Sequence, residues 1–277
     1  MEGDPQRDRG ARSLIPRANI TAWRGIAPWP DDAQVEQDLV ISRALVELYS
    51  NPLLAESLAF RGGTALNKMY LDPPVRYSED IDLVQKESGP IGEISREIHG
   101  VLDDWLGHPR TSSSENSFTM KYRFETSFEP VIKARLKIEI NTREHFSVHG
   151  FKKREISVKN PWFNGSAELS TYSISELLGT KLRALFQRKK GRDLFDLWIG
   201  LKHPDISPDD LIESYMAYME FGGTPVKRAR FEDNVESKME DERFLKDIEP
   251  LLRQEIEYDP HKAWETVREK IVSRLPE

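Results

Sequence analysis

The chain has 277 residues, of which 38% are hydrophobic, and this content is sufficient for a sizeable core in one large or two modest domains. It contains no cysteine, which excludes disulfides, thiolate catalysis and zinc sites with cysteine ligands. It also lacks an apolar run of about 18 residues and an apolar segment near Met1, so we expect a cytoplasmic protein without a signal peptide or membrane span.

The first part of the chain predicts an arm, a helix and a strand. Residues 1–30 are rich in Arg, Pro and Asp, which is typical of a mobile N-terminal arm. Residues 33–49 have apolar side chains at helical spacing, and Asn51-Pro52 ends this predicted helix. The apolar run from Leu58 to Phe60 is typical of the end of a buried strand.

A pair of glycines, Gly62 and Gly63, follows that strand and allows the backbone to turn tightly and approach a ligand. We expect Thr64 to cap a helix over residues 65–70. Because a helix N-terminus presents unpaired N–H groups and a partial positive charge, this turn predicts a phosphate site. Taken alone, a Gly-Gly pair before a helix more often marks an ordinary turn.

Two acids then flank an isoleucine: Asp80 and Asp82 lie on either side of Ile81 in a predicted strand, so both carboxylates point to one face. Two carboxylates about 4 Å apart repel each other by roughly 4 kcal/mol at an effective dielectric of about 20. A hard divalent cation removes this penalty, and Mg²⁺ prefers oxygen ligands. An isolated Asp-x-Asp is more often an exposed strand end, but the two motifs in this order predict a phosphate-binding turn followed by a metal-binding strand.

The residues that follow predict a helix, a loop and two further strands of the same sheet. Residues 91–106 have the pattern of an amphipathic helix, and residues 109–116 form a Ser-rich loop. Residues 117–126 and 133–141 alternate apolar and polar side chains and predict two strands. In the second of these strands, Glu139 shares a face with Arg135 and Lys137. Taken alone, Glu139 is more often a solvent-facing strand residue.

Charge is unevenly distributed along the chain. The net charge of −7 argues against global attraction to nucleic acid, but residues 151–192 contain ten Lys and Arg against three acids, whereas residues 232–277 contain fourteen acids against eight bases. The basic segment is therefore the candidate surface for an anionic substrate. The candidate RNA-binding residues in it are Lys152, Lys153, Arg154, Arg188, Lys189, Lys190 and Arg192.

An aromatic pair, Trp162 and Phe163, lies in the same basic segment, within residues 145–167. The combination is compatible with RNA backbone contact and base stacking. A charged loop over a hydrophobic plug explains these residues equally well, and the sequence does not distinguish the two. A change in composition near Tyr172 predicts the boundary with a helical second half.

The first helix of that second half carries a lysine of interest. Ser173 opens the helix, and Glu176 completes a capping box. Lys181 lies beside the apolar face of this helix. A lysine at such an edge usually extends its ammonium to water. The alternative is that the ammonium reaches into a cleft and neutralises triphosphate charge.

Two acids near the start of the following helix, Asp193 and Asp196, lie three residues apart. The helix dipole favours acids at such a position, which by itself explains either residue. The remaining predicted helices complete a bundle and cover residues 208–221, 232–255 and 260–275.

The runs Phe-Arg-Gly-Gly-Thr-Ala-Leu and Arg-Tyr-Ser-Glu-Asp-Ile-Asp-Leu resemble the AbiEii type of nucleotidyltransferase toxin. This type is a branch of the DNA polymerase β-like nucleotidyltransferase superfamily that includes mycobacterial MenT toxins, and the resemblance covers residues 35–200. It implies an α+β fold. After the arm of residues 1–30, a nucleotidyltransferase mixed sheet flanked by helices would occupy residues 31–170, and a helical domain residues 171–277.

The resemblance also implies a set of site residues. Glu139 is the best match for the family's third acid, so Asp80, Asp82 and Glu139 would hold Mg²⁺ or Mn²⁺. The segment Glu-Leu-Leu-Gly-Thr-Lys-Leu-Arg-Ala-Leu matches the family's lysine motif and favours a catalytic Lys181. The segment Arg-Asp-Leu-Phe-Asp-Leu favours Asp196 as the acid that faces the site, with Asp193 pairing Arg192 or Lys181. The implied nucleotide-binding residues are Arg61, Gly62, Gly63, Thr64, Ser78, Lys181 and Asp193.

For the function, the resemblance implies a toxin that transfers a nucleoside monophosphate from an NTP, expected to be a pyrimidine nucleotide, to the 3′ acceptor end of tRNA. This transfer would block aminoacylation and translation. The implied partner is a winged-helix AbiEi-like antitoxin, in a system for phage defence. Two alternatives stay open: a nucleotide-binding module without turnover, and the same fold acting on a protein or small-molecule acceptor.

Overall fold

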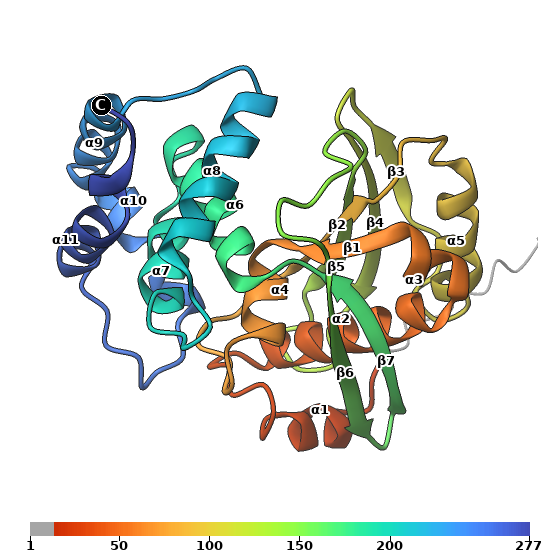
Figure 1. The fold of residues 1–277 in the computed structure, drawn as a ribbon. Helices are drawn as coiled ribbons and strands as arrows, with labels where there is room; N and C mark the ends of the chain where they lie inside the picture. The colour runs from red at the N-terminus through yellow and green to blue at the C-terminus, as the bar shows by residue number, and fades with distance from the viewer. Residues whose placement is uncertain (1–13) are drawn as a thin grey trace, which may run out of the picture.

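The computed structural model describes residues 14–277, which form one mixed β-sheet and a series of helices (Figure 1). The sheet has seven strands in the order β3-β4-β5-β2-β1-β7-β6. The strands are β1 (Leu58–Arg61), β2 (Asp80–Gln85), β3 (Arg110–Ser113), β4 (Ser117–Glu125), β5 (Lys133–Asn141), β6 (Lys152–Asn160) and β7 (Phe163–Thr171).

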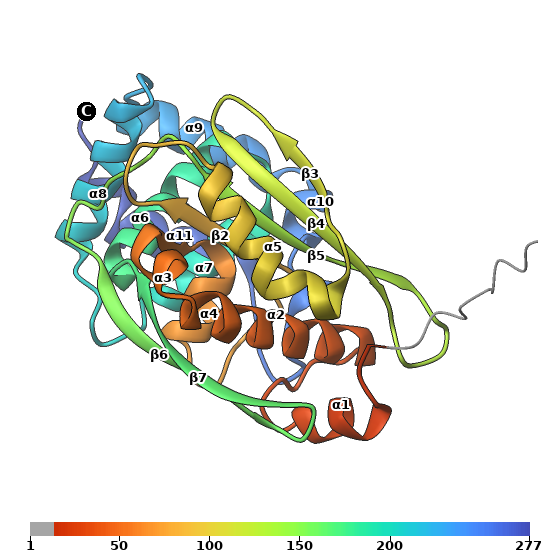
Figure 2. The ribbon, with the colours of Figure 1, turned by 90° about the vertical axis from the view of Figure 1, so that its right-hand side faces the viewer.

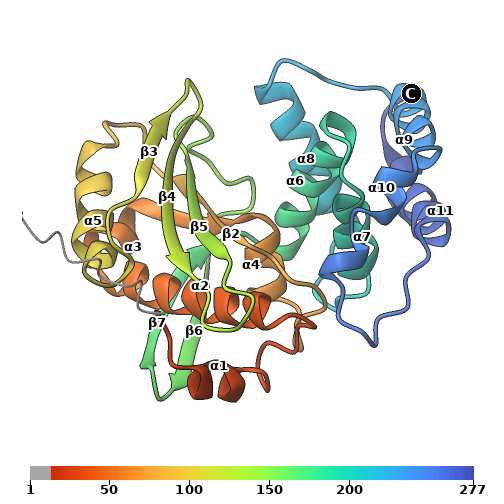
Figure 3. The same ribbon diagram turned by 180° about the vertical axis from the view of Figure 1, so that it is seen from behind.

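Helices lie on both sides of this sheet. Figures 2 and 3 show α2 and α5 over one side and the helices from α6 onward on the other. The N-terminal helices are α1 (Arg17–Trp23), α2 (Asp32–Ser50), α3 (Pro52–Ser57), α4 (Gly62–Met69) and α5 (Gly92–Leu106). The C-terminal helices are α6 (Ile174–Gln187), α7 (Gly191–Gly200), α8 (Pro208–Phe221), α9 (Arg228–Met239), α10 (Glu242–Lys246) and α11 (Pro260–Lys270), with short 3₁₀ turns at Glu249–Leu251 and Val272–Arg274.

The two faces of the central strands differ in character. Ile81 on β2 and Ile138 on β5 are register partners and fully buried, on the face from which Tyr122 reaches Asp103 of α5. Because successive side chains of a strand point to opposite faces, Asp80, Asp82 and Glu139 point to the other face, toward α4 and α6. These two strands thus turn apolar side chains to one face of the sheet, and their acids gather on the other.

The register of the central strands fixes where these acids lie. Strand β2 pairs with β1 in the antiparallel direction and with β5 in the parallel direction. In this register Asp82 is the partner of both Arg61 and Glu139, while Asp80 is the partner of Lys137. The predicted α+β class, with a mixed sheet followed by helices, is confirmed.

The N-terminal region departs from the prediction. Residues 1–13 of the expected arm lie outside the described residues, but residues 14–30 contain α1 and pack into the core. Trp23 and Trp29 are buried and both donate their indole N–H to Asp38, at 3.0 and 3.2 Å. The two tryptophans anchor this segment, so the prediction of a mobile arm is wrong for residues 14–30.

Three other segments also differ from prediction. Residues 145–167, for which no strand was predicted, contribute β6 and the start of β7, and Ile156 and Val158 are buried between exposed polar neighbours. The Ser-rich loop contains the edge strand β3. The predicted helix over residues 232–255 is interrupted, because Asp241 accepts hydrogen bonds from the backbone N–H groups of Arg243 and Phe244 and starts α10. Among residues 14–277, no helix combines the length and the apolar character needed to traverse a lipid bilayer.

Candidate active site

Three carboxylates line a crevice of about 160 Å³ between the sheet and the C-terminal helices. Asp80 and Asp82 come from β2, and Glu139 comes from β5. Burial raises the pKa of Asp82, and the charge of Asp80 raises this pKa further, against the opposing effect of nearby cations. The part of the crevice around Asp80 and Asp82 therefore carries negative charge that a bound cation would relieve.

A lysine contacts two of these acids. The ammonium of Lys137 lies 3.0 Å from Asp80 Oδ2 and 3.1 Å from Glu139 Oε2. Partial burial acts to lower the pKa of Lys137, but Asp80 and Glu139 outweigh it and the pKa is raised. Sequence reasoning gave Lys137 no role, although its alternation with Glu139 placed both side chains on one face. In the structure it neutralises part of the acidic cluster.

The cluster fits a divalent metal ion such as Mg²⁺ or Mn²⁺. Carboxylate oxygens are the hard ligands that these ions prefer, and the bridging ammonium already occupies a cation position between two of them. The Lys137 side chain is 24% exposed and has a flexible four-carbon stem, so it can leave this position. Asp80, Asp82 and Glu139 are thus the residues that would hold the metal.

If the Lys137 ammonium competes with a divalent ion, then Lys137→Met will bind Mn²⁺ at least tenfold more tightly than the parent, since removing one positive charge strengthens the field of the acids. Isothermal titration with MnCl₂ alone measures this directly. Lys133→Met, which removes an exposed ammonium from the same strand, is the matched control. Weaker or unchanged Mn²⁺ binding by the Lys137 variant would refute the competition.

The glycine turn lies against the acids. Gly62 has a φ of +81°, and a Cβ atom built there would be 2.1 Å from Asp82 Oδ2. A Cβ on Gly63 would be 2.4 Å from Arg76 Nη2 and 3.4 Å from Lys181 Nζ. Both positions therefore need glycine for close approach, and Gly62 needs it also for its backbone conformation.

We expect Gly62→Ala to lower the free energy of unfolding by about 1–3 kcal/mol, because alanine is strained at positive φ and its methyl group meets the Asp82 carboxylate. Urea unfolding checks the value. In Gly100→Ala, within α5, the new methyl group meets no atom within 4 Å, so this control should be stabilised by up to about 1 kcal/mol. Equal effects of the two substitutions would contradict this account.

Helix α4 begins earlier than expected. It starts at Gly62, so Thr64 is its third residue and not its N-cap. The Thr64 hydroxyl is buried, donates to the carbonyl oxygen of Asp80 at 2.5 Å and lies 2.8 Å from the Ser78 hydroxyl. Thr64 thus ties the glycine turn to the first residue of β2, while Ser78 lines the crevice.

Lys181 enters the crevice from α6. Its side chain is 8% exposed, and its ammonium lies 2.8 Å from Asp196 Oδ2 and 3.3 Å from Asp193 Oδ1. We predicted that Asp196 faces the site, but both carboxylates are fully buried and do not line the crevice. They lie behind Lys181 and hold it in place.

Two arginines also form ion pairs with these two buried acids. Arg76 contacts Asp196 through both Nε and Nη2, at 2.6 and 2.7 Å, and Arg188 contacts Asp193 through Nε and Nη2, at 2.7 and 2.8 Å. Burial acts to raise the pKa of Asp196, but Arg76 and the neighbouring lysine outweigh it and hold the pKa at about 2. Sequence reasoning missed the role of Arg76, although it lies just upstream of the acidic motif.

Arg61 lies in a second ion-pair cluster beside the crevice. Its Nη1 is 2.8 Å from Glu144 Oε2, and Arg183 contacts both oxygens of Glu144 at 2.5 and 3.2 Å. Burial acts to raise the pKa of Glu144, but the two arginines outweigh it and the pKa falls to about 2. Arg61 and Arg183 line an adjoining cavity of about 340 Å³, which shares Asp82 and Glu139 with the crevice.

Glu176 also differs from its expected role. Ser173 accepts a hydrogen bond from the Glu176 backbone, as the capping box requires, but the Glu176 carboxylate is buried and turned elsewhere. It accepts hydrogen bonds from the Ser147 hydroxyl and from the backbone N–H groups of Val148 and His149. The carboxylate therefore fixes the loop between β5 and β6 on α6.

The candidate RNA-binding residues fall into two groups. Arg188 and Arg192 line the crevice, and Lys189 and Lys190, in the same turn, contact Asp241 and Asp247. The others are on β6, at the far edge of the sheet: Lys152, Lys153 and Arg154. The basic segment of the sequence is thus not one continuous surface.

The aromatic pair of the basic segment packs within the protein. Arg43 stacks on the rings of Trp105, Trp162 and Phe163, with its guanidinium carbon 4.1, 4.5 and 5.0 Å from their centroids. The indoles of Trp105 and Trp162 also pack edge to face. Of the two interpretations that the sequence left open, this packing favours the hydrophobic plug.

One family model and several solved structures are similar to this chain. A family model described as nucleotidyl transferase AbiEii toxin, type IV TA system, matches residues 43–270. The fold is similar to that of MenT4, a nucleotidyltransferase toxin from Mycobacterium tuberculosis H37Rv, with a TM-score of 0.64 at 16% identity over 94% of this chain and 90% of that one.

Two structures from Helicobacter pylori are also similar in fold. JHP933 has a TM-score of 0.55 at 18% identity, covering 87% of this chain and 90% of that one. A putative nucleotidyltransferase has a TM-score of 0.54 at 19% identity, covering 87% of this chain and 93% of that one. No curated protein sequence matches the chain.

Proposed function

Because the chain belongs to the AbiEii family of nucleotidyltransferase toxins of type IV toxin–antitoxin systems, we propose that it transfers a nucleoside monophosphate from an NTP to the 3′ acceptor end of tRNA. The observation that carries this proposal is the arrangement of the crevice. Asp80, Asp82, Glu139 and Lys181 all line it, and Lys181 lies beside the glycine turn. Such a site can hold both a metal ion and the triphosphate that the ion accompanies.

In this proposal the triphosphate binds at the turn that begins α4. The first turn of a helix presents unpaired N–H groups, and Gly62 and Gly63 allow a phosphate to approach them closely. Lys181 and Arg76 lie next to Gly63 and offset the phosphate charge. The buried Asp196 holds both cations in place before substrate arrives, so little reorganisation is needed.

The transfer step forms one bond and breaks another. The 3′-hydroxyl oxygen of the acceptor bonds to the α-phosphorus, the bond from that phosphorus to the bridging oxygen breaks, and pyrophosphate leaves. Glu139 lines both the crevice and the adjoining cavity, so it lies where an acceptor would enter and can accept the hydroxyl proton. A divalent metal held by the three acids would neutralise phosphate charge and lower the pKa of the attacking hydroxyl.

The charges around the crevice support tRNA as the acceptor. Arg188 and Arg192 lie at the crevice, where the acceptor backbone would pass, and Arg183 lies in the adjoining cavity. The phosphate backbone of a nucleic acid binds such side chains through charge. The tRNA acceptor and a preference for pyrimidine nucleotides rest on the resemblance to MenT-like toxins, and a winged-helix AbiEi-like antitoxin is the partner that we propose on the same ground.

The decisive assay incubates the protein with total tRNA, Mg²⁺ and each of the four labelled NTPs in turn. We expect label at the 3′ end of tRNA, strongest with CTP or UTP, and none with the Asp82→Ala variant. If the label appears on a protein or a small molecule instead, the proposed nucleotidyl transfer holds but the acceptor is not tRNA. No label on any acceptor, or equal label with Asp82→Ala, would refute the proposal.

A further inference from the structure

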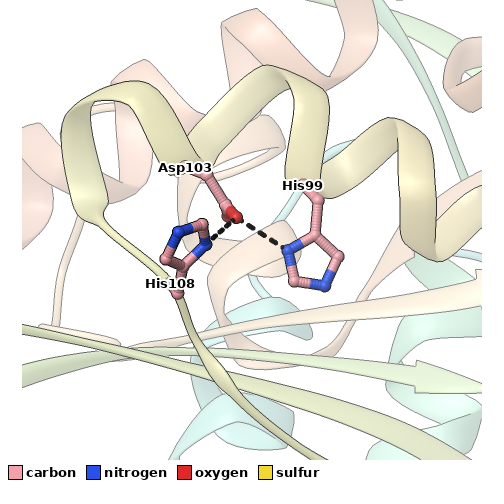
Figure 4. Close-up of side chains that lie close together, drawn as sticks. All are labelled: His99, Asp103 and His108. Atoms are coloured by element: carbon pink, nitrogen blue, oxygen red, sulfur yellow. Dashed lines mark hydrogen bonds and ion pairs between the residues drawn. The ribbon is translucent and has the colours of Figure 1, made fainter.

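A second group of metal-ligand side chains lies at the C-terminal end of α5, and Figure 4 shows that His99 and His108 both point at Asp103. Asp103 Oδ2 lies 2.9 Å from His99 Nδ1 and 2.7 Å from His108 Nδ1. His99 and Asp103 are four residues apart on one helix face. Gly107, at a φ of +73°, ends the helix and turns the chain so that His108 returns to Asp103.

The carboxylate at the centre of this group is held by a residue from the sheet. The Tyr122 hydroxyl, on β4, donates to Asp103 Oδ1 at 3.0 Å, which leaves Oδ2 for the two imidazoles. Tyr122 is fully buried and the Asp103 side chain is 14% exposed, so this contact fixes the carboxylate. An outer hydrogen bond that orients a ligand is typical of metal sites in proteins.

The ligand chemistry points to a transition metal. We propose that His99, Asp103 and His108 bind one divalent transition-metal ion, with Zn²⁺ as the natural probe, in addition to the metal of the active crevice. Two imidazole nitrogens and one carboxylate oxygen suit Zn²⁺, which leaves a further position for water, whereas Mg²⁺ prefers an all-oxygen set. The three ligand atoms lie within 4.8 Å of one another, and the His108 side chain is 90% exposed and free to close on an ion.

This site is separate from the crevice. Tyr122 is the register partner of Leu136 on β5, and both point to the apolar face that α5 covers, whereas Glu139 points to the opposite face. An ion here would join the end of α5 to the segment that leads into β3. Because it binds the folded chain only, it would raise the melting temperature without entering the transfer reaction.

Isothermal titration with ZnCl₂ tests the site. The full chain carries Asp82→Ala in this experiment, so that the crevice acids bind less Zn²⁺. We expect one Zn²⁺ per chain at this site, and at least tenfold weaker binding when His108→Ala or Asp103→Asn is added. His261→Ala, which removes an exposed histidine from α11, is the control and should bind as the parent does. Thermal melts without metal establish that each variant is folded.

Three outcomes would overturn the proposal: no Zn²⁺ binding, equal binding by a His99→Ala and His108→Ala double variant, or displacement of the ion by an equal concentration of Mg²⁺. The group His149, Asp210 and Glu213 offers a second test. If His149→Ala abolishes the Zn²⁺ binding and the His108 variant keeps it, the ion belongs to that other group and the assignment to α5 is wrong.

Discussion

Replacing Asp82 with asparagine should lower the rate of nucleotide transfer by about a thousandfold without lowering stability. Asp82 is the register partner of Glu139 across β2 and β5, so its loss removes one of the three acids that we propose hold the metal. The raised pKa of Asp82 means that its ionised form is less favourable in the folded chain than in the unfolded chain. Asparagine removes that charge, so the free energy of unfolding at pH 7 should stay equal or rise.

Two measurements check this prediction: the labelled-NTP assay and urea unfolding of the same preparation. Asp104→Asn, which neutralises an exposed acid on α5, is the matched control and should change neither quantity appreciably. Loss of transfer together with a large loss of stability would mean that Asp82 supports the fold and not the reaction.

Replacing Asp196 with asparagine, unlike the Asp82 substitution, should destabilise the protein. We expect the free energy of unfolding to fall by about 3–5 kcal/mol, because Arg76 and Lys181 lose their buried counterion. Transfer should fall as well, since both cations then move. Urea unfolding of the variant and the parent measures the loss. If the variant is as stable as the parent but has lost transfer, Asp196 acts at the site, as the resemblance implied, and does not mainly support the fold.

The lowered pKa of Asp196 also predicts how the stability of the protein depends on pH. The folded-state pKa of Asp196 is about 2, below its ordinary value of 3.8, so its contribution to stability is complete above about pH 4 and is lost as the pH falls toward 2. The parent should therefore lose stability over this range more steeply than Asp196→Asn. Parallel pH profiles for the two proteins would exclude this carboxylate as the cause.

Strand alternation predicted which face each crevice acid occupies, whereas the choice of Glu139 as the third acid came from the resemblance to the AbiEii type. Asp82 and Glu139 each lie between apolar residues, and Asp80 is two positions before Asp82, so a period of two places the three acids on one face once β2 and β5 are neighbours. Alternation gave the face of Lys137 as well, but not its contacts, since those depend on the parallel register of the two strands.

The burial of Asp193 and Asp196 could not be predicted in this way. Acids near a helix start are ordinary surface residues, and only the packing of α7 distinguishes these two. A Cβ atom on Gly191 would lie 2.0 Å from the carbonyl oxygen of Phe244, so the start of α7 is pressed against α10. That contact joins residues more than fifty positions apart, and no local pattern reports it.

The strands β6 and β7 were missed for a related reason. Polar residues alternate with Ile156 and Val158, but a pattern that weak becomes a strand only when a partner strand is present. Here each strand is the partner of the other, and β7 also pairs with β1. The N-terminal tryptophans likewise find their common acceptor, Asp38, only in the folded chain.

The parallel pairing of β2 with β5 has a consequence for cells that escape the toxin. Deleting a single codon within β5 ahead of Glu139 would turn that acid toward the core and Ile138 toward water, so the chain would lose its site and its fold together. Survivors with such deletions should contain little of the protein. Survivors with an Asp82 substitution should instead accumulate it at full abundance, as an inert copy that still occupies any antitoxin recognising its surface.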